Sequence, residues 1–474
     1  MKNIRFIIAL IVSVPLLVGC DDFFNLKPSD AIPTEDALNT VADAQMIMNG
    51  VYSGFKSSDS YGTALTIYPA LMTDAALATT FFTNQHGNAY AWKLYPGSSE
   101  VAGMWMTSYA AIYNATFIIN NIDGVEGSED KIKQIKGEAY VARALLHYNL
   151  VRLFGKAYSQ ADDDDLGVPY VTENKVAQPK RNTVKEVYNY IIDDIEMAIN
   201  HLPSIYDQTY FSLEFAYGLM ARVALDMEDY YPAVDYASKV IDSSIFYLSS
   251  GFNYINMYVH DAGSEIIWKV GYTPTDAGAA PGYNFYNRNG PTQLPSPDYI
   301  PAQWWLDELA EYNDIRKNNI VYTQTGFGWN GLLLQKYPTN PSFDQQGLNM
   351  PKPMRLAEMY LIRAEAYAFL NNDDEAADDM ETLMAYRIDP APVVEQKGDA
   401  LKALIEKERR KELMFEGFHW FDLKRKGLGF KREPQPNTNV ANDLEIPADD
   451  FRWQWPIPTV ELNGNENIEQ NEGY

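Results

Sequence analysis

The sequence predicts a mainly α-helical fold, in which antiparallel pairs of helices form a scaffold and long irregular inserts separate the pairs. Apolar residues recur at alternating steps of three and four in several segments, which places them on one face of a helix. Two such segments are joined to another helix by a tight turn. Between the pairs, stretches rich in Ser, Thr, Gly, Asn and Pro show no sustained helical period.

Composition bounds the class of protein. The chain has 474 residues, 46% of them hydrophobic, so a large core can be buried. A single cysteine excludes a disulfide scaffold and Cys-rich zinc modules. The formal charge of −26 disfavours nucleic acid and anionic membrane surfaces as partners. Tyrosine is abundant, with 33 Tyr against 21 Phe and 9 Trp, which supplies many rings with an apolar face and a polar tip.

The N-terminus predicts a lipoprotein signal peptide over residues 1–19. Two positive charges in Met1–Arg5 precede the apolar run Phe6–Val18, which is too short to span a bilayer. The ending Leu17-Val18-Gly19-Cys20 resembles a bacterial lipobox, which predicts a lipid on the Cys20 sulfur and a membrane attachment through that lipid. The alternative is a conventional signal peptide followed by a buried free cysteine.

Four helix pairs follow from the apolar periodicity, at about residues 102–154, 183–242, 354–388 and 399–426. The clearest apolar stripes in the first pair are Trp105, Tyr109, Ile112, Thr116 and Ile119, then Ala139, Ala142, Leu146, Leu150 and Leu153. In the second pair, Ala216, Met220, Val223 and Met227 precede a break at 228–232. Small Ala residues at the predicted crossings and a repeat near 34 residues resemble tetratricopeptide units.

The long inserts, at about 56–101, 246–300 and 322–353, are the predicted site of function. Long irregular segments within a helical scaffold are usually functional. They carry aromatic rings beside Asn, Asp and Arg, a combination that suits the apolar faces and hydroxyl edges of sugars. The alternative for each ring is that it packs its loop onto the scaffold; Trp304 and Trp305, in a predicted helix, are expected in the core. The candidate ligand-binding residues are Asp74, Trp92, Tyr95, Tyr283, Tyr286 and Trp329.

No motif predicts a catalytic, metal or cofactor site. The five histidines never form an i, i+4 pair, and the acidic run 162–165 lacks the spaced ligands of a calcium loop. The run 326–331 matches Gly-x-Gly-x-x-Gly, but no helix follows it to present its N-terminus to a pyrophosphate, so a glycine-rich loop is predicted. A pair of carboxylates of the glycosidase type stays possible, because the chain contains many of them.

A set of motifs spread over nearly the whole chain resembles the SusD/RagB family of outer-membrane lipoproteins of Bacteroidetes. Asp21 and Asp22 directly after the lipobox are similar to the acidic surface-export signal of such lipoproteins. The other motifs are Phe23-Phe24, Trp105-x-x-x-Tyr109-x-x-Ile112-x-Asn114, Glu138-Ala139-Tyr140-x-Ala142-Arg143-Ala144, Asp314-x-Arg316, Arg355–Ala366, Glu408–Gly417, Asp422-Leu423-x-Arg425, Pro456-Ile457-Pro458 and the terminal Gln470–Tyr474.

This resemblance implies a single SusD-like domain over 20–474 and a function without catalysis. The implied protein sits in the outer leaflet, faces outward, and passes oligosaccharides to a SusC-like TonB-dependent transporter. Peptide cargo and, less favoured, a secreted glycoside hydrolase are the alternatives. The resemblance also implies that Asp74, Trp92, Tyr95, Tyr283 and Tyr286 belong to an aromatic binding arc.

The charged residues of the motifs are interpreted as scaffold. Glu408, Arg409, Arg410, Glu412 and Glu416 are expected to pair along one helix, and Asp422 with Arg425 to extend that network. Arg143, Arg363 and Glu365 lie in Ala-rich helices and are expected to find charged partners at helix crossings.

Overall fold

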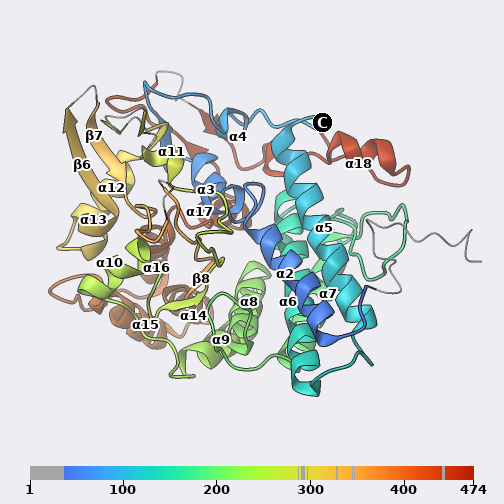
Figure 1. The fold of residues 1–474 in the computed structure, drawn as a ribbon. Helices are drawn as coiled ribbons and strands as arrows, with labels where there is room; N and C mark the ends of the chain where they lie inside the picture. The colour runs from blue at the N-terminus through green and yellow to red at the C-terminus, as the bar shows by residue number, and fades with distance from the viewer. Residues whose placement is uncertain are drawn as a thin grey trace, which may run out of the picture.

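Figure 1 shows the computed structural model, which describes residues 37–286, 288–289, 294–295, 297–326, 329–343, 345, 347–439 and 444–474. The predicted signal peptide and Cys20 lie outside the described residues. The side chains of residues 286–296, 318–330 and 332 are also outside the description.

Long helices form the scaffold, and neighbours along the chain pack against each other. Packing runs from α5 through α6, α7, α8 and α9 to α14, which also contacts α15 and α16, while α2 lies against α5 and α6. In Figure 1 the helices α5, α6 and α7 lie side by side, and the β6–β7 hairpin occupies the opposite edge. The scaffold helices are α2 (Val41–Phe55), α5 (Ser99–Asn121), α6 (Glu129–Phe154), α7 (Val184–Ile199), α8 (Leu213–Asp226), α9 (Tyr230–Ile241), α14 (Leu356–Phe369), α15 (Asp373–Ala385), α16 (Gly398–Leu413) and α17 (His419–Arg425).

Short elements fill the segments between the scaffold helices. The short helices are α3 (Ala64–Leu71), α4 (Gly87–Tyr90), α10 (Gly251–Val259), α11 (Tyr283–Tyr286), α12 (Gln303–Ala310), α13 (Ile315–Ile320) and α18 (Thr459–Gly464), with single 3₁₀ turns at Tyr158–Gln160 and Phe451–Trp453. The antiparallel strand pairs are β1 (Ala76–Ala78) with β5 (Tyr299–Pro301), β2 (Ile266–Trp268) with β8 (Met354–Arg355), β3 (Arg288–Asn289) with β4 (Leu294–Pro295), β6 (Val321–Gly326) with β7 (Trp329–Leu334), and β9 (Phe430–Lys431) with β10 (Glu445–Ile446).

The apolar stripes are confirmed as core. Every residue of the Ala139 to Leu153 stripe is at most 4% exposed, and Ile112 and Thr116 are fully buried. Local chemistry sets the starts of two scaffold helices: Thr40 with Asp43, and Thr183 with Glu186, form reciprocal side-chain to backbone caps. The predicted mainly α-helical scaffold with helix pairs is therefore what the chain forms.

Three local predictions need correction. Helix α3 lies inside the first insert, where no helix was expected; all eight of its residues are buried, so it has no polar face to reveal a period. Helix α9 begins at Tyr230, inside the predicted break at 228–232. Pro232 does not interrupt the helix, because a proline in the first turn loses no hydrogen bond. In the glycine-rich run 326–331, Gly326 ends β6 and residues 329–331 begin β7, so the described part of the run is strand rather than loop.

Candidate functional site

The three inserts of the sequence analysis meet in the structure. Strands β1 and β5 join the first insert to the second, with Leu77 opposite Ile300. Leu77, Ile300 and Leu333, one from each insert, form a small hydrophobic cluster separate from the main core. Helix α11 also packs against β5 and β7. We call the surface built from the described residues of 76–86, 283–301 and 329–334 the insert face.

Hydrogen bonds fix the first insert on the second. The Thr79 N–H donates to the Asp298 carbonyl at 2.9 Å, and the Thr83 N–H donates to Asp298 Oδ1 at 2.5 Å. The Tyr299 hydroxyl donates to the Gln85 carbonyl at 2.6 Å. Asp298 is fully buried, and this burial raises the pKa of its carboxyl group. Sequence reasoning missed Asp298, because an aspartate among prolines carries no motif.

Aromatic rings on the insert face divide into a buried layer and an exposed layer. Phe82, Tyr90 and Tyr299 pack together with ring centroids 5.2–6.0 Å apart. On α11 the Phe285 ring is buried, whereas Tyr283 is 37% exposed. Tyr283 is therefore partly accessible at the surface, and its contact with a ligand remains a prediction.

Tyr95 is more exposed than Tyr283 but has different neighbours. Its side chain is 57% exposed, and its N–H donates to Ser98 Oγ at 2.9 Å just before α5 begins. The adjacent Pro96 carbonyl accepts from the Thr459 N–H at the start of α18. In Figure 1, α18 lies at the upper right and α11 lies left of centre, with α4 between them. The structure thus puts Tyr95 beside α18 and α5, apart from the β1–β5 ladder.

Trp92 differs from the prediction of an exposed platform. Its side chain is only 3% exposed, and its ring packs against Trp453 and Phe430 with centroids 4.9 and 5.6 Å away. The indole N–H donates to the Met72 carbonyl at 2.6 Å. With both faces covered and its one donor used, this ring holds the first insert on the C-terminal segment and has no face for a ligand in this conformation.

Asp74 is engaged with the scaffold. Its Oδ1 lies 3.0 Å from His419 Nε2 at the start of α17, and its carbonyl accepts from the Trp304 indole N–H at 3.1 Å. The Asp74 side chain remains 24% exposed. Trp305 is fully buried, as predicted, whereas Trp304 is half-buried beside His419.

The side chains of Tyr286 and Trp329 lie outside the described residues. Their backbones belong to α11 and β7, which pack against each other, and Trp329 pairs with Gly326 at the end of the hairpin. Both predictions therefore remain predictions.

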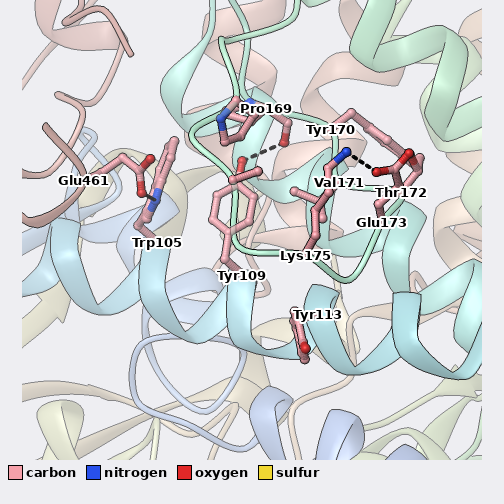
Figure 2. Close-up of a pocket in the computed structure, with 12 residues that line it drawn as sticks. Trp105, Tyr109, Tyr113, Pro169, Tyr170, Val171, Thr172, Glu173, Lys175 and Glu461 are labelled. Atoms are coloured by element: carbon pink, nitrogen blue, oxygen red, sulfur yellow. Dashed lines mark hydrogen bonds and ion pairs between the residues drawn. The ribbon is translucent and has the colours of Figure 1, made fainter. Parts of the chain in front are cut away.

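A concave site of another kind lies on the scaffold and is shown in Figure 2. Its volume is about 380 Å³, and three distant segments line it: α5, the loop 169–179 and α18. Trp105, Tyr109 and Tyr113, one turn apart on α5, form its aromatic wall. Glu461 of α18 accepts from the Trp105 indole N–H at 3.2 Å. We call this cavity the α5 pocket.

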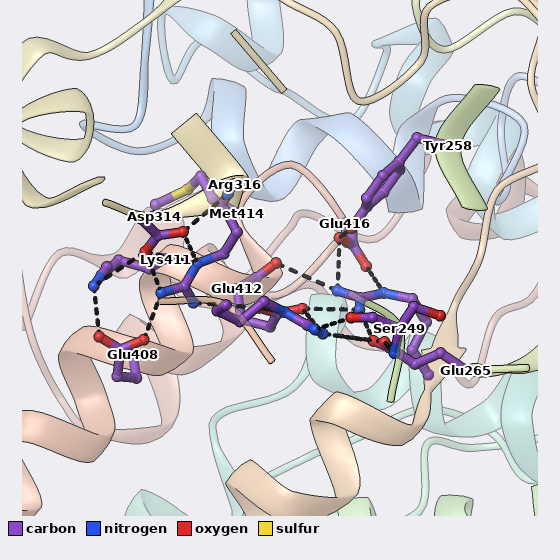
Figure 3. A network of polar contacts seen from close by, with 12 residues as sticks. Ser249, Tyr258, Glu265, Asp314, Arg316, Glu408, Lys411, Glu412, Met414 and Glu416 are labelled. Carbon is purple, nitrogen blue, oxygen red and sulfur yellow. Dashed lines mark hydrogen bonds and ion pairs between the residues drawn. The ribbon is translucent and has the colours of Figure 1, made fainter. Parts of the chain in front are cut away.

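The charged residues of the sequence motifs form a buried network, drawn in Figure 3. Three buried arginines converge on Glu412: Arg355 and Arg387 donate to its Oε1 at 2.9 and 3.0 Å, and Arg316 to its Oε2 at 3.2 Å. These arginines hold the pKa of Glu412 well below its usual range, against the effect of burial. The same network includes Glu265, Asp314, Lys336, Glu408, Lys411 and Glu416.

Pairing of the motif charges is confirmed, and part of it runs along one helix, since Arg410 pairs with Glu406 within α16. Arg143 pairs with Asp194, Arg363 with Asp379, and Arg425 with both Glu365 and Asp422. The expected pairing within the Glu408–Glu416 helix is wrong for Glu412 and Glu416, whose partners come from distant segments, and α16 ends at Leu413. Helical spacing predicts neighbours on a helix but carries no information on partners across a crossing.

The described residues contain neither a cluster of metal ligands nor a membrane-spanning helix. No group of three or more His, Cys, Asp or Glu side chains in that part of the chain is arranged to hold a metal ion. None of its helices is both long and apolar enough to cross a bilayer.

Comparison with known proteins covers both halves of the chain. A SusD-like model described as starch-binding and associating with the outer membrane matches residues 22–225, and the SusD family model matches residues 277–474. The chain is 25% identical to SusD-like protein P2 of Formosa agariphila over 99% of this chain and all of the relative.

Two solved structures have a fold similar to that of this chain. A SusD superfamily protein of Bacteroides thetaiotaomicron has a TM-score of 0.81 at 26% identity, covering 91% of this chain and 99% of its own. A putative sugar-binding protein of Bacteroides vulgatus has a TM-score of 0.81 at 25% identity, covering 92% of this chain and 99% of its own. With both family models matched and the helical scaffold in common, this chain belongs to the SusD/RagB family.

Proposed function

We propose that this protein binds oligosaccharides at the cell surface without cleaving them and delivers them to a SusC-like TonB-dependent transporter. The observation that carries the proposal is the insert face, where three inserts join and Tyr283 presents a ring that is 37% exposed. A rigid ring binds the apolar face of a sugar with little loss of conformational entropy. Membership of a family with a sugar-binding relative supports this ligand class.

Tyr283→Ala is expected to weaken binding of the preferred oligosaccharide about tenfold, since loss of one stacking ring removes about 1.4 kcal/mol. Isothermal titration calorimetry against a panel of oligosaccharides measures this. Tyr231→Ala is the matched control, because this tyrosine is 76% exposed on the scaffold helix α9 and is expected to leave affinity unchanged.

Three outcomes would contradict the proposal. Unchanged affinity in Tyr283→Ala would remove the aromatic platform. Binding of oligopeptides in place of oligosaccharides would change the cargo. Release of reducing sugar by the purified protein would make it a hydrolase. Each outcome is distinct from a folding defect, which a thermal melt of the same variants detects.

A second prediction concerns the lipid anchor on Cys20 and the transporter partner. Cys20→Ser is expected to shift the protein from the membrane fraction to the soluble fraction, since a lipid on the Cys20 sulfur is the proposed attachment. Affinity purification of the unaltered protein from detergent-solubilised outer membranes is expected to recover a large β-barrel protein. Retention of the Cys20→Ser protein in membranes, or absence of a co-purifying barrel, would contradict the respective part of the proposal.

A further inference from the structure

We propose that the α5 pocket is a second carbohydrate-binding subsite that takes a neutral oligosaccharide. It rests on the proposed glycan-binding function but uses none of the residues of the insert face. Its volume of about 380 Å³ falls within the range of small-ligand sites, and the three segments that line it lie far apart in the sequence.

The aromatic wall supplies faces for sugar rings. Tyr109 and Tyr113 are four residues apart on α5, so their side chains leave the same side of the helix about 6 Å apart along its axis. Tyr109 is half-buried and Tyr113 is 45% exposed, which leaves part of each ring accessible. Figure 2 shows Trp105 and Tyr109 side by side on α5, beneath the loop that begins at Pro169.

Polar groups at the two ends of the α5 pocket can form hydrogen bonds with sugar hydroxyls. Glu461 is held in place by the Trp105 indole N–H and by Asn465 Nδ2 at 2.9 Å, so its carboxylate can accept from a hydroxyl without rearranging. At the other end, Glu173 and Lys175 form an ion pair with side chains 63% and 65% exposed. Two carboxylates and one ammonium give the pocket a negative balance, which disfavours uronic and sulfated sugars and favours neutral ones.

Hydrogen bonds hold the loop 169–179, which forms the wall of the pocket opposite α5. The Tyr109 hydroxyl donates to the Pro169 carbonyl at 2.8 Å, and the Val171 N–H donates to His147 Nε2 at 3.2 Å. Burial lowers the pKa of His147 to about 3, so this acceptor nitrogen stays unprotonated at ordinary pH.

The other end of the loop is tied to α18. Gln178 Nε2 donates to the Gly464 carbonyl at 2.9 Å, and Asn465 Nδ2 donates to the Pro179 carbonyl at 2.9 Å. A loop fixed at both ends needs little ordering when a ligand arrives, which favours binding.

The test fills the pocket without removing any contact. Ala177 lines the pocket and is exposed, so Ala177→Trp occupies the cavity. The matched control is Val176→Trp, because the adjacent Val176 is fully exposed and does not line the cavity. Tyr113→Ala removes a wall ring as a second, independent variant. Malto-, laminari-, cello-, xylo- and mannohexaose are titrated calorimetrically into each protein.

We expect Ala177→Trp and Tyr113→Ala each to lose one binding event, or at least tenfold in affinity, with Val176→Trp unchanged. If both pocket variants bind the hexaoses with the same affinity and stoichiometry as the unaltered protein, the subsite is overturned. If Tyr283→Ala abolishes that binding, the insert face is the sole binding site for these hexaoses. Loss of binding in the pocket variants but not in Tyr283→Ala upholds the subsite and removes the insert-face platform. Absence of binding by the unaltered protein to all five hexaoses overturns the subsite, and the oligosaccharide panel then decides the proposed function separately.

Discussion

Replacing Glu412 with alanine is expected to lower the free energy of unfolding by about 3–5 kcal/mol, because removal of one partner leaves buried charges uncompensated. Its two carboxylate oxygens accept from Arg316, Arg355 and Arg387, and each of these arginines is at most 1% exposed. Urea unfolding followed by tryptophan fluorescence measures the loss. The affected arginines come from the start of α13, from β8 and from the segment just after α15, so the unfolding midpoint of the whole scaffold should fall.

The control is an ion pair that lies at the protein surface. Lys397 and Asp374 pair with side chains 51% and 90% exposed, so Lys397→Ala should change stability by at most about 0.5 kcal/mol. A loss in Glu412→Ala no larger than that in Lys397→Ala would show that the network contributes specificity rather than stability.

Acid provides a second measurement of the same effect. Arginine partners hold the pKa of Glu412 well below its usual range, and those around Glu365 lower the pKa of that carboxyl to about 2. A depressed folded-state pKa contributes stability that is present above the unfolded value near 4.5 and is lost as the pH falls toward 2. The unaltered protein should therefore lose stability over this window more steeply than Glu412→Ala.

Sequence periodicity predicted a scaffold helix such as α5 because that helix buries mainly one face. Ile112 and Ile119 are buried, whereas Met106 and Tyr113 are exposed. Helix α3 escaped detection because burial on all sides leaves no period. The partners of Glu412 could not be predicted, because helical spacing identifies only charges on the same helix and Arg316 lies 96 residues away along the chain.

The candidate site was harder to predict than the scaffold. Trp92 and Tyr95 stand three positions apart in one insert, yet the first is 3% exposed and the second 57%. An aromatic residue in a polar insert satisfies the same pattern whether it packs inward or faces solvent, so only the tertiary contacts with Trp453 and Phe430 distinguish them. The α5 pocket could not be predicted, since it needs α5, the loop 169–179 and α18 in one place.

Relative to the unaltered protein, Glu138→Gln is expected to gain about 3 kcal/mol of stability between pH 4 and pH 8. Glu138 is fully buried in α6, and its neighbours donate through Gln134 Nε2 at 2.7 Å and the Tyr52 hydroxyl at 3.1 Å, neither of which is charged. Burial raises the pKa of Glu138 to about 7. Between about 4.5 and 7 the folded chain therefore holds a proton that the unfolded chain has released, and stability falls as the pH rises through this window.

Glutamine keeps the shape of the side chain and never ionises. Its amide nitrogen cannot accept the hydrogen bond that one Glu138 oxygen accepts, but this cost is the same at both pH values. Urea unfolding of both proteins at pH 4 and pH 8 gives the difference; the acid loss around Glu412 affects both proteins equally and cancels. Glu395→Gln, at an exposed position, is the matched control and should show no pH-dependent difference. A stability difference between the two proteins that is the same at pH 4 and pH 8 would contradict this prediction, because it would mean that burial does not disfavour the ionised form of Glu138. Glu138 and Glu412 should thus give pH slopes of opposite sign, since one carboxyl is buried among neutral donors and the other among three arginines.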